Sequence, residues 1–202
     1  MNVMKVLESQ DPSQEQLQSV LNLYTHGKLQ QALSESSQML ERFPNSVVLY
    51  NISGASNAAL KRFDAAIDSY KQALRIKPDY AEVHNNMGNA LSIKGDLAEA
   101  IESYKKALRI KPDYAVAYNN MANAMKDKGD LAEAIESCKQ ALKIKPDYAD
   151  AYYNMANAMK DKGDLAEAIE SYKQALKIKP NYAEAYYNMG NALNEKGSPE
   201  AA

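Results

Sequence analysis

The sequence predicts an all-α protein built from consecutive antiparallel helix pairs, and three observations support this prediction. Prolines recur every 34 residues, at Pro44, Pro78, Pro112, Pro146 and Pro180. Residues 115–148 and 149–182 are identical except at four positions. Within each 34-residue segment, apolar and small residues recur at steps of three and four. A fixed period of this length with helical spacing is typical of stacked helical repeats rather than of one compact core.

The period divides the 202 residues into frames. We expect residues 1–12 to form an N-terminal extension before the first frame. Five full frames then follow, at 13–46, 47–80, 81–114, 115–148 and 149–182. Residues 183–202 form a truncated sixth frame, which we expect to act as a terminal helix.

Each full frame is predicted to contain two amphipathic helices joined by a tight turn. In frame 81–114, apolar and small residues lie at His84, Met87, Gly88, Ala90 and Leu91, and then at Leu97, Ala100, Ile101, Tyr104, Ala107 and Leu108. Gly95 allows the backbone conformation at which the first helix ends, and Pro112 prevents the second helix from continuing. Asp79 with Glu82, and Asp96 with Glu99, fit the pattern of capping boxes. Lys61 replaces the turn glycine in frame 47–80, so we expect this turn to be the least rigid.

Composition and charge exclude several functions. The net charge is only -2, which gives no bulk field for nucleic acid or anionic membranes. No stretch approaches the roughly twenty apolar residues that a membrane-spanning helix needs, and no secretory leader is evident. The single cysteine, Cys138, takes the place of Tyr172 in the next frame, so we expect it in the core of a cytoplasmic protein. RNA-binding helical repeats have a related period but need more positive charge.

No catalytic residue, metal site or cofactor site is predicted. The two histidines, His26 and His84, lie in different frames, and His84 occupies the position of Tyr118 and Tyr152, which indicates packing. The acidic pairs Asp96–Glu99, Asp130–Glu133 and Asp164–Glu167 all stand at predicted helix starts, where capping explains them. We therefore expect a protein that is not an enzyme.

The frames resemble the tetratricopeptide repeat (TPR) family. The residues of its signature read Tyr118, Met121, Ala122, Met125, Ala134, Cys138, Ala141 and Pro146 in one frame, and Tyr152, Met155, Ala156, Met159, Ala168, Tyr172, Ala175 and Pro180 in the next. The resemblance implies a right-handed superhelical solenoid of antiparallel helix pairs. It also implies that the first helices line a concave groove and the second helices a convex surface.

Two rows of asparagines follow the first helices at positions that the signature does not use. They are Asn86, Asn120, Asn154 and Asn188, and three residues later Asn89, Asn123, Asn157 and Asn191, with Tyr153 and Tyr187 beside them. An amide side chain both donates and accepts hydrogen bonds, so such rows can hold the backbone of an extended peptide. They resemble the asparagines of the TPR arm of O-linked N-acetylglucosamine transferases. The alternative is that some of them only bond neighbouring helices.

The expected ligand is a protein or peptide that is not held by its terminal carboxylate. TPR clamps for chaperone C-termini carry lysine where this chain has Glu82, Val116, Asp150 and Glu184, and arginine where it has asparagine. An acidic groove favours neutral or basic peptides.

We therefore expect a scaffold that binds an extended peptide or partner protein in the groove. One alternative is the client-recognition arm of a larger enzyme, such as a glycosyl-, sulfo- or methyltransferase. Another is a structural protein that self-associates, because the last helix keeps Tyr186, Tyr187, Met189 and Leu193 instead of a polar outer face. The sequence does not choose between a fragment and a homo-oligomer.

Overall fold

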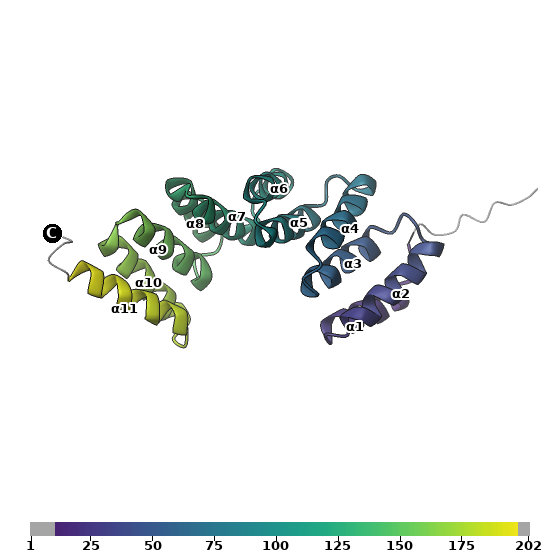
Figure 1. The fold of residues 1–202 in the computed structure, drawn as a ribbon, viewed down its shortest axis with the longest axis horizontal. Helices are drawn as coiled ribbons and strands as arrows, with labels where there is room; N and C mark the ends of the chain where they lie inside the picture. Colours follow the sequence, from purple (N-terminus) through teal and green to yellow (C-terminus); the bar gives the residue numbers. More distant parts are fainter. Residues whose placement is uncertain (1–10, 198–202) are drawn as a thin grey trace, which may run out of the picture. The chain divides into compact units, whose positions relative to one another are not determined.

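A computed structural model describes residues 11–197, and within this range every regular element is a helix. The helices are α1 (Gln14–Thr25), α2 (Leu29–Arg42), α3 (Val47–Ala59), α4 (Phe63–Ile76), α5 (Ala81–Lys94), α6 (Leu97–Ile110), α7 (Ala115–Lys128), α8 (Leu131–Ile144), α9 (Ala149–Lys162), α10 (Leu165–Ile178) and α11 (Ala183–Lys196) (Figure 1). The all-α prediction is confirmed. From α3 onward the odd-numbered helices, which we call first helices, begin every 34 residues.

The chain forms two compact units, and the first of them ends at Lys94. In this unit α1 packs on α2, α2 on α3, α3 on α4 and α4 on α5, while the first helices α1, α3 and α5 also contact in sequence. The core between α1, α2 and α3 is built from Val20, Ala32, Leu49 and Ile52. Helix α4 adds the buried ring of Tyr70.

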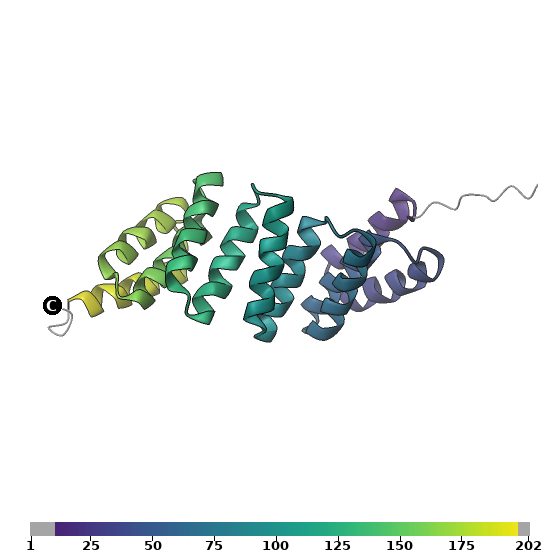
Figure 2. The ribbon, with the colours of Figure 1, turned by 90° about the horizontal axis from the view of Figure 1, so that it is seen from above.

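The second unit begins at Gly95 and contains α6 to α11. Each of these helices packs on the next, and the first helices α7, α9 and α11 also contact one another in order (Figure 2). Alanines at the helix crossings, such as Ala122 and Ala134, are almost completely buried. Because alanine lets two backbones approach closely, the larger side chains around them can interlock.

The turns within the frames confirm the predicted role of glycine. Gly95 follows α5 with a φ of +96°, and Gly129 and Gly163 end α7 and α9 with φ of +95° and +92°. Lys61 adopts the same left-handed conformation, with a φ of +60°. Frame 47–80 therefore keeps the turn geometry of the other frames in spite of a side chain that strains it.

A lysine and a tyrosine meet at the last four of the five junctions between frames, whereas Arg42 lies over Phe43 at the first. The ammonium groups of Lys77, Lys111, Lys145 and Lys179 lie 4.0 to 5.0 Å from the ring centroids of Tyr80, Tyr114, Tyr148 and Tyr182. The proline that follows each lysine ends the second helix, and the tyrosine leads into the next first helix. These cation–π contacts thus fix the same short connection at the ends of these four frames.

Cys138 and His84 lie in the core, as predicted. Cys138 is fully buried between α7, α8 and α9, and burial raises the pKa of its thiol to about 12. The Nε2 atom of His84 lies 2.8 Å from the carbonyl oxygen of Pro78, and its side chain is buried. Neither residue is placed for catalysis.

Replacing Lys61 by glycine is expected to stabilise the protein. A residue other than glycine pays roughly 1–2 kcal/mol for the left-handed conformation, and the greater freedom of glycine in the unfolded chain offsets part of the gain. Lys61→Gly should therefore raise the free energy of unfolding by about 0.5–1 kcal/mol in a urea titration. Lys61→Ala removes the same charge but keeps Cβ, so equal stability of the two variants would contradict the strain at this turn.

Gly54 is expected to be essential for the packing of α3 on α4. A Cβ at this position would lie 2.8 Å from Cζ of the buried Tyr70 ring. Gly54→Ala should lower the free energy of unfolding by about 1–3 kcal/mol, since overpacking forces a buried ring to move. Gly190 is the matched control, because it occupies the same frame position but a Cβ there meets nothing within 4 Å. A loss in Gly190→Ala as large as that in Gly54→Ala would rule out the steric explanation.

Candidate functional site

The asparagines predicted to bind a ligand in the second unit share one side of its first helices with the residue four positions before each first-row asparagine. They stand at spacings of four and then three residues, which places them on one helix face. We call this set the first-helix face: Val116, Asn120 and Asn123 on α7, Asp150, Asn154 and Asn157 on α9, and Glu184, Asn188 and Asn191 on α11. All nine are half-buried or exposed. Since α7 contacts α9 and α9 contacts α11, the face continues from helix to helix.

In the first asparagine row, three members donate hydrogen bonds to the preceding first helix. The Nδ2 atom of Asn154 donates to Oδ1 of Asn119 at 3.0 Å, and Nδ2 of Asn188 donates to the hydroxyl of Tyr153 at 2.9 Å. In the first unit, Nδ2 of Asn86 donates to Oδ1 of Asn51 at 3.2 Å. The acceptor lies 35 residues earlier in each case. These amides therefore form rungs between adjacent first helices, as the alternative interpretation of the sequence held.

The second row divides into bonded and exposed members. The Oδ1 atom of Asn157 accepts from the hydroxyl of Tyr172 at 2.6 Å and from Asn188 at 3.1 Å. Asn123 and Asn191 are exposed on α7 and α11, whereas Asn89 on α5 is half-buried. The amides with most freedom to meet a ligand are consequently those of Asn123 and Asn191.

The two predicted tyrosines differ in surroundings. The ring of Tyr153 packs against Tyr182, with centroids 4.9 Å apart, and against Tyr172 at 6.1 Å. Tyr153 thus belongs to a cluster of three tyrosine rings and does not stand alone at the surface. Tyr187, at the same position on α11, is 71% exposed.

The first-helix face is acidic at the N-terminal ends of α9 and α11. Asp150 is half-buried close to the hydroxyl of Tyr182, and Glu184 is exposed. Burial, reinforced by Asp150, raises the pKa of Tyr182, so this hydroxyl stays protonated. Within residues 11–197, neither Asp150 nor Glu184 has an ion pair with lysine or arginine. In contrast, Asp127 on α7 lies 2.8 Å from Lys126.

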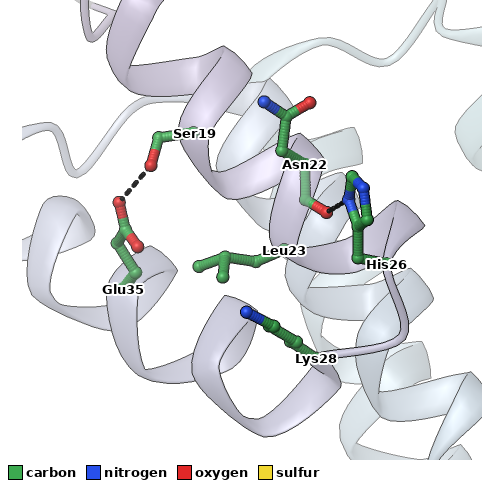
Figure 3. Close-up of a pocket in the computed structure, with 6 residues that line it drawn as sticks. All are labelled: Ser19, Asn22, Leu23, His26, Lys28 and Glu35. Carbon is green, nitrogen blue, oxygen red and sulfur yellow. Dashed lines mark hydrogen bonds between the residues drawn. The ribbon is translucent and has the colours of Figure 1, made fainter.

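An open hollow of about 310 Å³ lies away from these residues, on the α1–α2 pair (Figure 3). It is lined by Ser19, Asn22, Leu23, His26, Lys28 and Glu35. The hydroxyl of Ser19 donates to Glu35 at 3.1 Å, whereas His26 lies 2.7 Å from the backbone oxygen of Asn22 on its own helix. The histidine therefore does not activate the serine. In the part of the chain that the structure describes, no group of three His, Cys, Asp or Glu residues could hold a metal ion.

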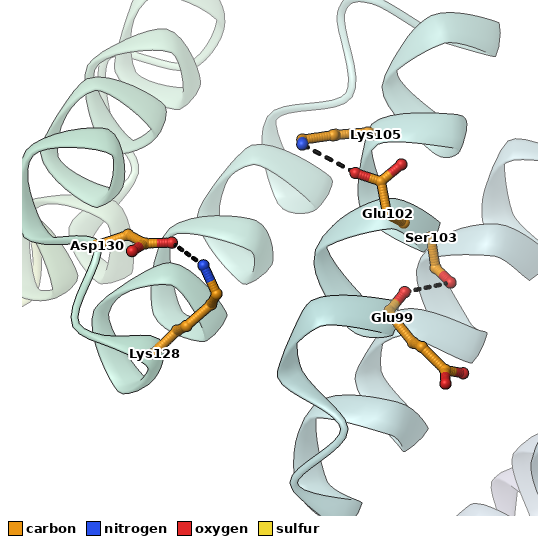
Figure 4. A network of polar contacts seen from close by, with 6 residues as sticks. All are labelled: Glu99, Glu102, Ser103, Lys105, Lys128 and Asp130. Carbon is orange, nitrogen blue, oxygen red and sulfur yellow. Dashed lines mark hydrogen bonds and ion pairs between the residues drawn. The ribbon is translucent and has the colours of Figure 1, made fainter.

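The predicted capping boxes are wrong for α6, and the same holds at the starts of α8 and α10. Asp96, Asp130 and Asp164 occupy N-cap positions but accept no capping hydrogen bond, because their ψ angles near +60° differ from the extended conformation that caps adopt. Instead, the carboxylate of Asp130 pairs with Lys128 at 2.6 Å (Figure 4). The carboxylate of Asp164 pairs with Lys162 at 2.7 Å. Ser13, with a ψ of 156°, forms a complete capping box with Gln16.

The acidic residues of the second helices form surface contacts. Glu102 and Lys105 on α6 lie 2.9 Å apart on the exposed surface, and this hydrogen bond lowers the pKa of Glu102 (Figure 4). The hydroxyl of Ser103 donates to the backbone oxygen of Glu99 at 2.9 Å. Both contacts lie within α6, and only the Glu102–Lys105 pair is exposed to solvent.

A sequence model of the TPR repeat matches residues 57–92, 88–129, 122–163 and 156–197, which together make up well over half of the chain. The chain therefore belongs to the tetratricopeptide repeat family. Its fold class is that of TPR arrays, and it has the architecture of protein-interaction scaffolds. No helix in residues 11–197 combines the length and the apolar character needed to cross a membrane.

Three known proteins show the extent of the similarity. The probable UDP-N-acetylglucosamine–peptide N-acetylglucosaminyltransferase SEC of Arabidopsis thaliana is 38% identical over 74 residues, which are 37% of this chain and 8% of that protein. The structure of PilW, a type IV pilus biogenesis factor, matches with a TM-score of 0.82 at 24% identity, over 95% of this chain and 90% of that one. The first TPR of Spaghetti (RPAP3), bound to the HSP90 peptide SRMEEVD, matches with a TM-score of 0.57 at 28% identity, over 58% of this chain and 94% of that one.

The rung asparagines are expected to contribute to stability, unlike the exposed ones. Asn154→Ala removes the donor to Asn119, a side chain that is only 6% exposed, and should lower the free energy of unfolding by about 1–2 kcal/mol. Asn123→Ala on the same face should stay within about 0.5 kcal/mol of the parent. Urea titrations of both variants measure the difference, and equal effects would show that the rungs do not support the stack.

Proposed function

We propose that the chain is a non-catalytic scaffold that binds an extended segment of a partner protein along the first-helix face. The observation that carries this proposal is the repetition of amide side chains on successive helices that contact one another. Asn123 and Asn191 are exposed, and each amide offers donors and an acceptor to a peptide backbone. The rung asparagines between them hold the face at a fixed spacing, which lowers the entropy cost of binding.

The charge on the face supports a neutral or basic partner segment. The Spaghetti TPR is bound to SRMEEVD, a peptide with three acidic residues. The first-helix face of this chain carries Asp150 and Glu184, which would repel such a peptide. Binding of an internal segment, away from any chain terminus, is consistent with this arrangement.

Two other functions have specific support. The match to the Arabidopsis transferase favours a client-recognition arm of a larger enzyme, although it spans a small part of that protein. Exposed Tyr186, Tyr187 and Leu193 on α11 favour association with a second copy. Both are compatible with a first-helix face that binds peptides, and both fit the cytoplasmic location that we expect.

A random-decapeptide library displayed on phage tests the proposed function. The full chain should recover a defined family of peptides, and synthetic copies should bind in fluorescence anisotropy. Asn123→Ala/Asn191→Ala removes two exposed amides and should weaken binding about tenfold, since each lost hydrogen bond is worth about 0.5–1.5 kcal/mol.

The matched control changes the second helices instead. Glu136→Gln/Glu170→Gln alters two exposed residues on α8 and α10 and should bind the peptides as the parent does. Circular dichroism confirms that all variants are folded. Recovery of no peptide by the parent, or equal affinity in the two double variants, would reject binding at the first-helix face.

A further inference from the structure

Two of the four differences between the nearly identical frames lie on the first helices α7 and α9. Frames 115–148 and 149–182 differ at 116/150, 119/153, 138/172 and 147/181. Val116 and Asp150 belong to the first-helix face, and Asn119 and Tyr153 lie one turn further along the same helices. The third pair, Cys138 and Tyr172, adjoins the second pair in the later frame, because the ring centroids of Tyr172 and Tyr153 lie 6.1 Å apart. Three of the four differences are thus contiguous, and only Asp147/Asn181 lies in a connecting turn.

The scaffold itself does not require the charge of Asp150. In the later frame Asp150 lies close to the hydroxyl of Tyr182. In the earlier frame the equivalent residue, Tyr148, lies close to the neutral side chain of Asn119, while the position of Asp150 holds Val116. The same junction is therefore built once beside a carboxylate and once without one. The negative charge and the added ring of Tyr153 need another explanation.

The changed residues create surroundings that suit a cation. Asp150 is half-buried next to the rings of Tyr153 and Tyr182, which lie 4.9 Å apart. On α11, the exposed Glu184 stands one turn before the exposed Tyr187. The nearby ammonium group of Lys179 lies over the ring of Tyr182, 4.0 Å from its centroid, and has no ion pair with Asp150. Carboxylates next to aromatic faces attract guanidinium groups by charge and by cation–π contact.

We propose that the α9–α11 part of the first-helix face accepts an arginine side chain of the bound segment, while the α7 part accepts an apolar side chain at Val116. This inference rests on the proposed function and specifies the ligand. Val116 is 42% exposed, so an apolar side chain placed on it would shield surface from water. The frames thereby share one scaffold and differ in the side chain that each selects.

The spacing between the two selected side chains follows from helix packing. Adjacent packed helices lie about 8–10 Å apart, and an extended chain advances about 3.3 Å per residue. One frame of the array therefore corresponds to about three residues of ligand. We expect the apolar and the basic positions of the ligand to be about three residues apart.

The same phage library tests this inference through the sequences that it returns. The parent chain should enrich arginine at one position about tenfold over alanine, because a paired cation at a partly buried carboxylate gains about 1–2 kcal/mol. Asp150→Asn/Glu184→Gln should abolish this enrichment while peptides are still recovered. The amide that replaces the carboxylate at position 150 still offers an acceptor to the hydroxyl of Tyr182, so the fold is preserved.

Asp147→Asn is the matched control, since it removes one charge in a turn where the copied frame already carries Asn181. It should retain the enrichment. Recovery of peptides whose basic position does not depend on Asp150 and Glu184 would overturn the arginine site and leave peptide binding intact. Recovery of no peptide by the parent would overturn both proposals.

A transplant between frames gives an independent test. Val116→Asp/Asn119→Tyr copies the two residues of the later frame into the earlier one, with Tyr148 then facing a carboxylate as Tyr182 does. The selected peptides should gain a second basic position, about three residues from the first, in place of the apolar one. An unchanged peptide family in this folded variant would contradict the assignment of side-chain choice to these two positions.

Discussion

The structure depends on one constraint: a helix pair of this sequence cannot cover its own apolar side and must be buried by its neighbours. Ala122 and Ala134 lie in a core cluster that is completed by Met155 and Ala158 of the next frame. The next cluster likewise joins Ala156 and Tyr172 to Ala185 and Ala192 of α11. Each of these core clusters is therefore shared between frames, and stability accumulates along each unit by contacts between neighbours. Nearly identical frames, such as 115–148 and 149–182, are the simplest sequence that satisfies this constraint. A helix surface that fits its neighbour then also fits each further copy.

The features of the fold that repeat every 34 residues could be predicted from the sequence. Gly95 and Pro112 mark helix ends through properties of their own backbones, so no knowledge of the neighbours is needed. Whether the side chain of Asp96 caps α6 could not be predicted in this way, and in the structure it does not. A cap requires an extended backbone at the cap residue, and the tight turn after the glycine imposes a different ψ. At Asp130 a lysine two residues earlier also takes the carboxylate. Sequence spacing identifies a residue that can cap, but the turn decides whether it does.

The candidate site was predictable as a pattern and not as a set of contacts. Two rows of asparagines are visible in the sequence, yet the acceptor of Asn154 is Asn119, which belongs to neither row. Asn119 and Asn154 are 35 residues apart, one more than the repeat. That these two side chains meet is seen only when α7 and α9 lie side by side. Asn51, the acceptor of Asn86, was missed because frame 47–80 has Ile52 where the later frames have the row asparagine. Some of the amides therefore bond neighbouring first helices, and others face the solvent.

Each rung and each core cluster joins only adjacent frames, and each lysine–tyrosine contact lies at the end of a single frame. Removing or adding one whole 34-residue frame among near-identical copies would therefore recreate a junction that already exists. The length of such an array can change by recombination within its gene without any new interface having to evolve. The length of the binding face can then evolve through the number of frames. The choice of partner can evolve separately, through a few substitutions on one helix face.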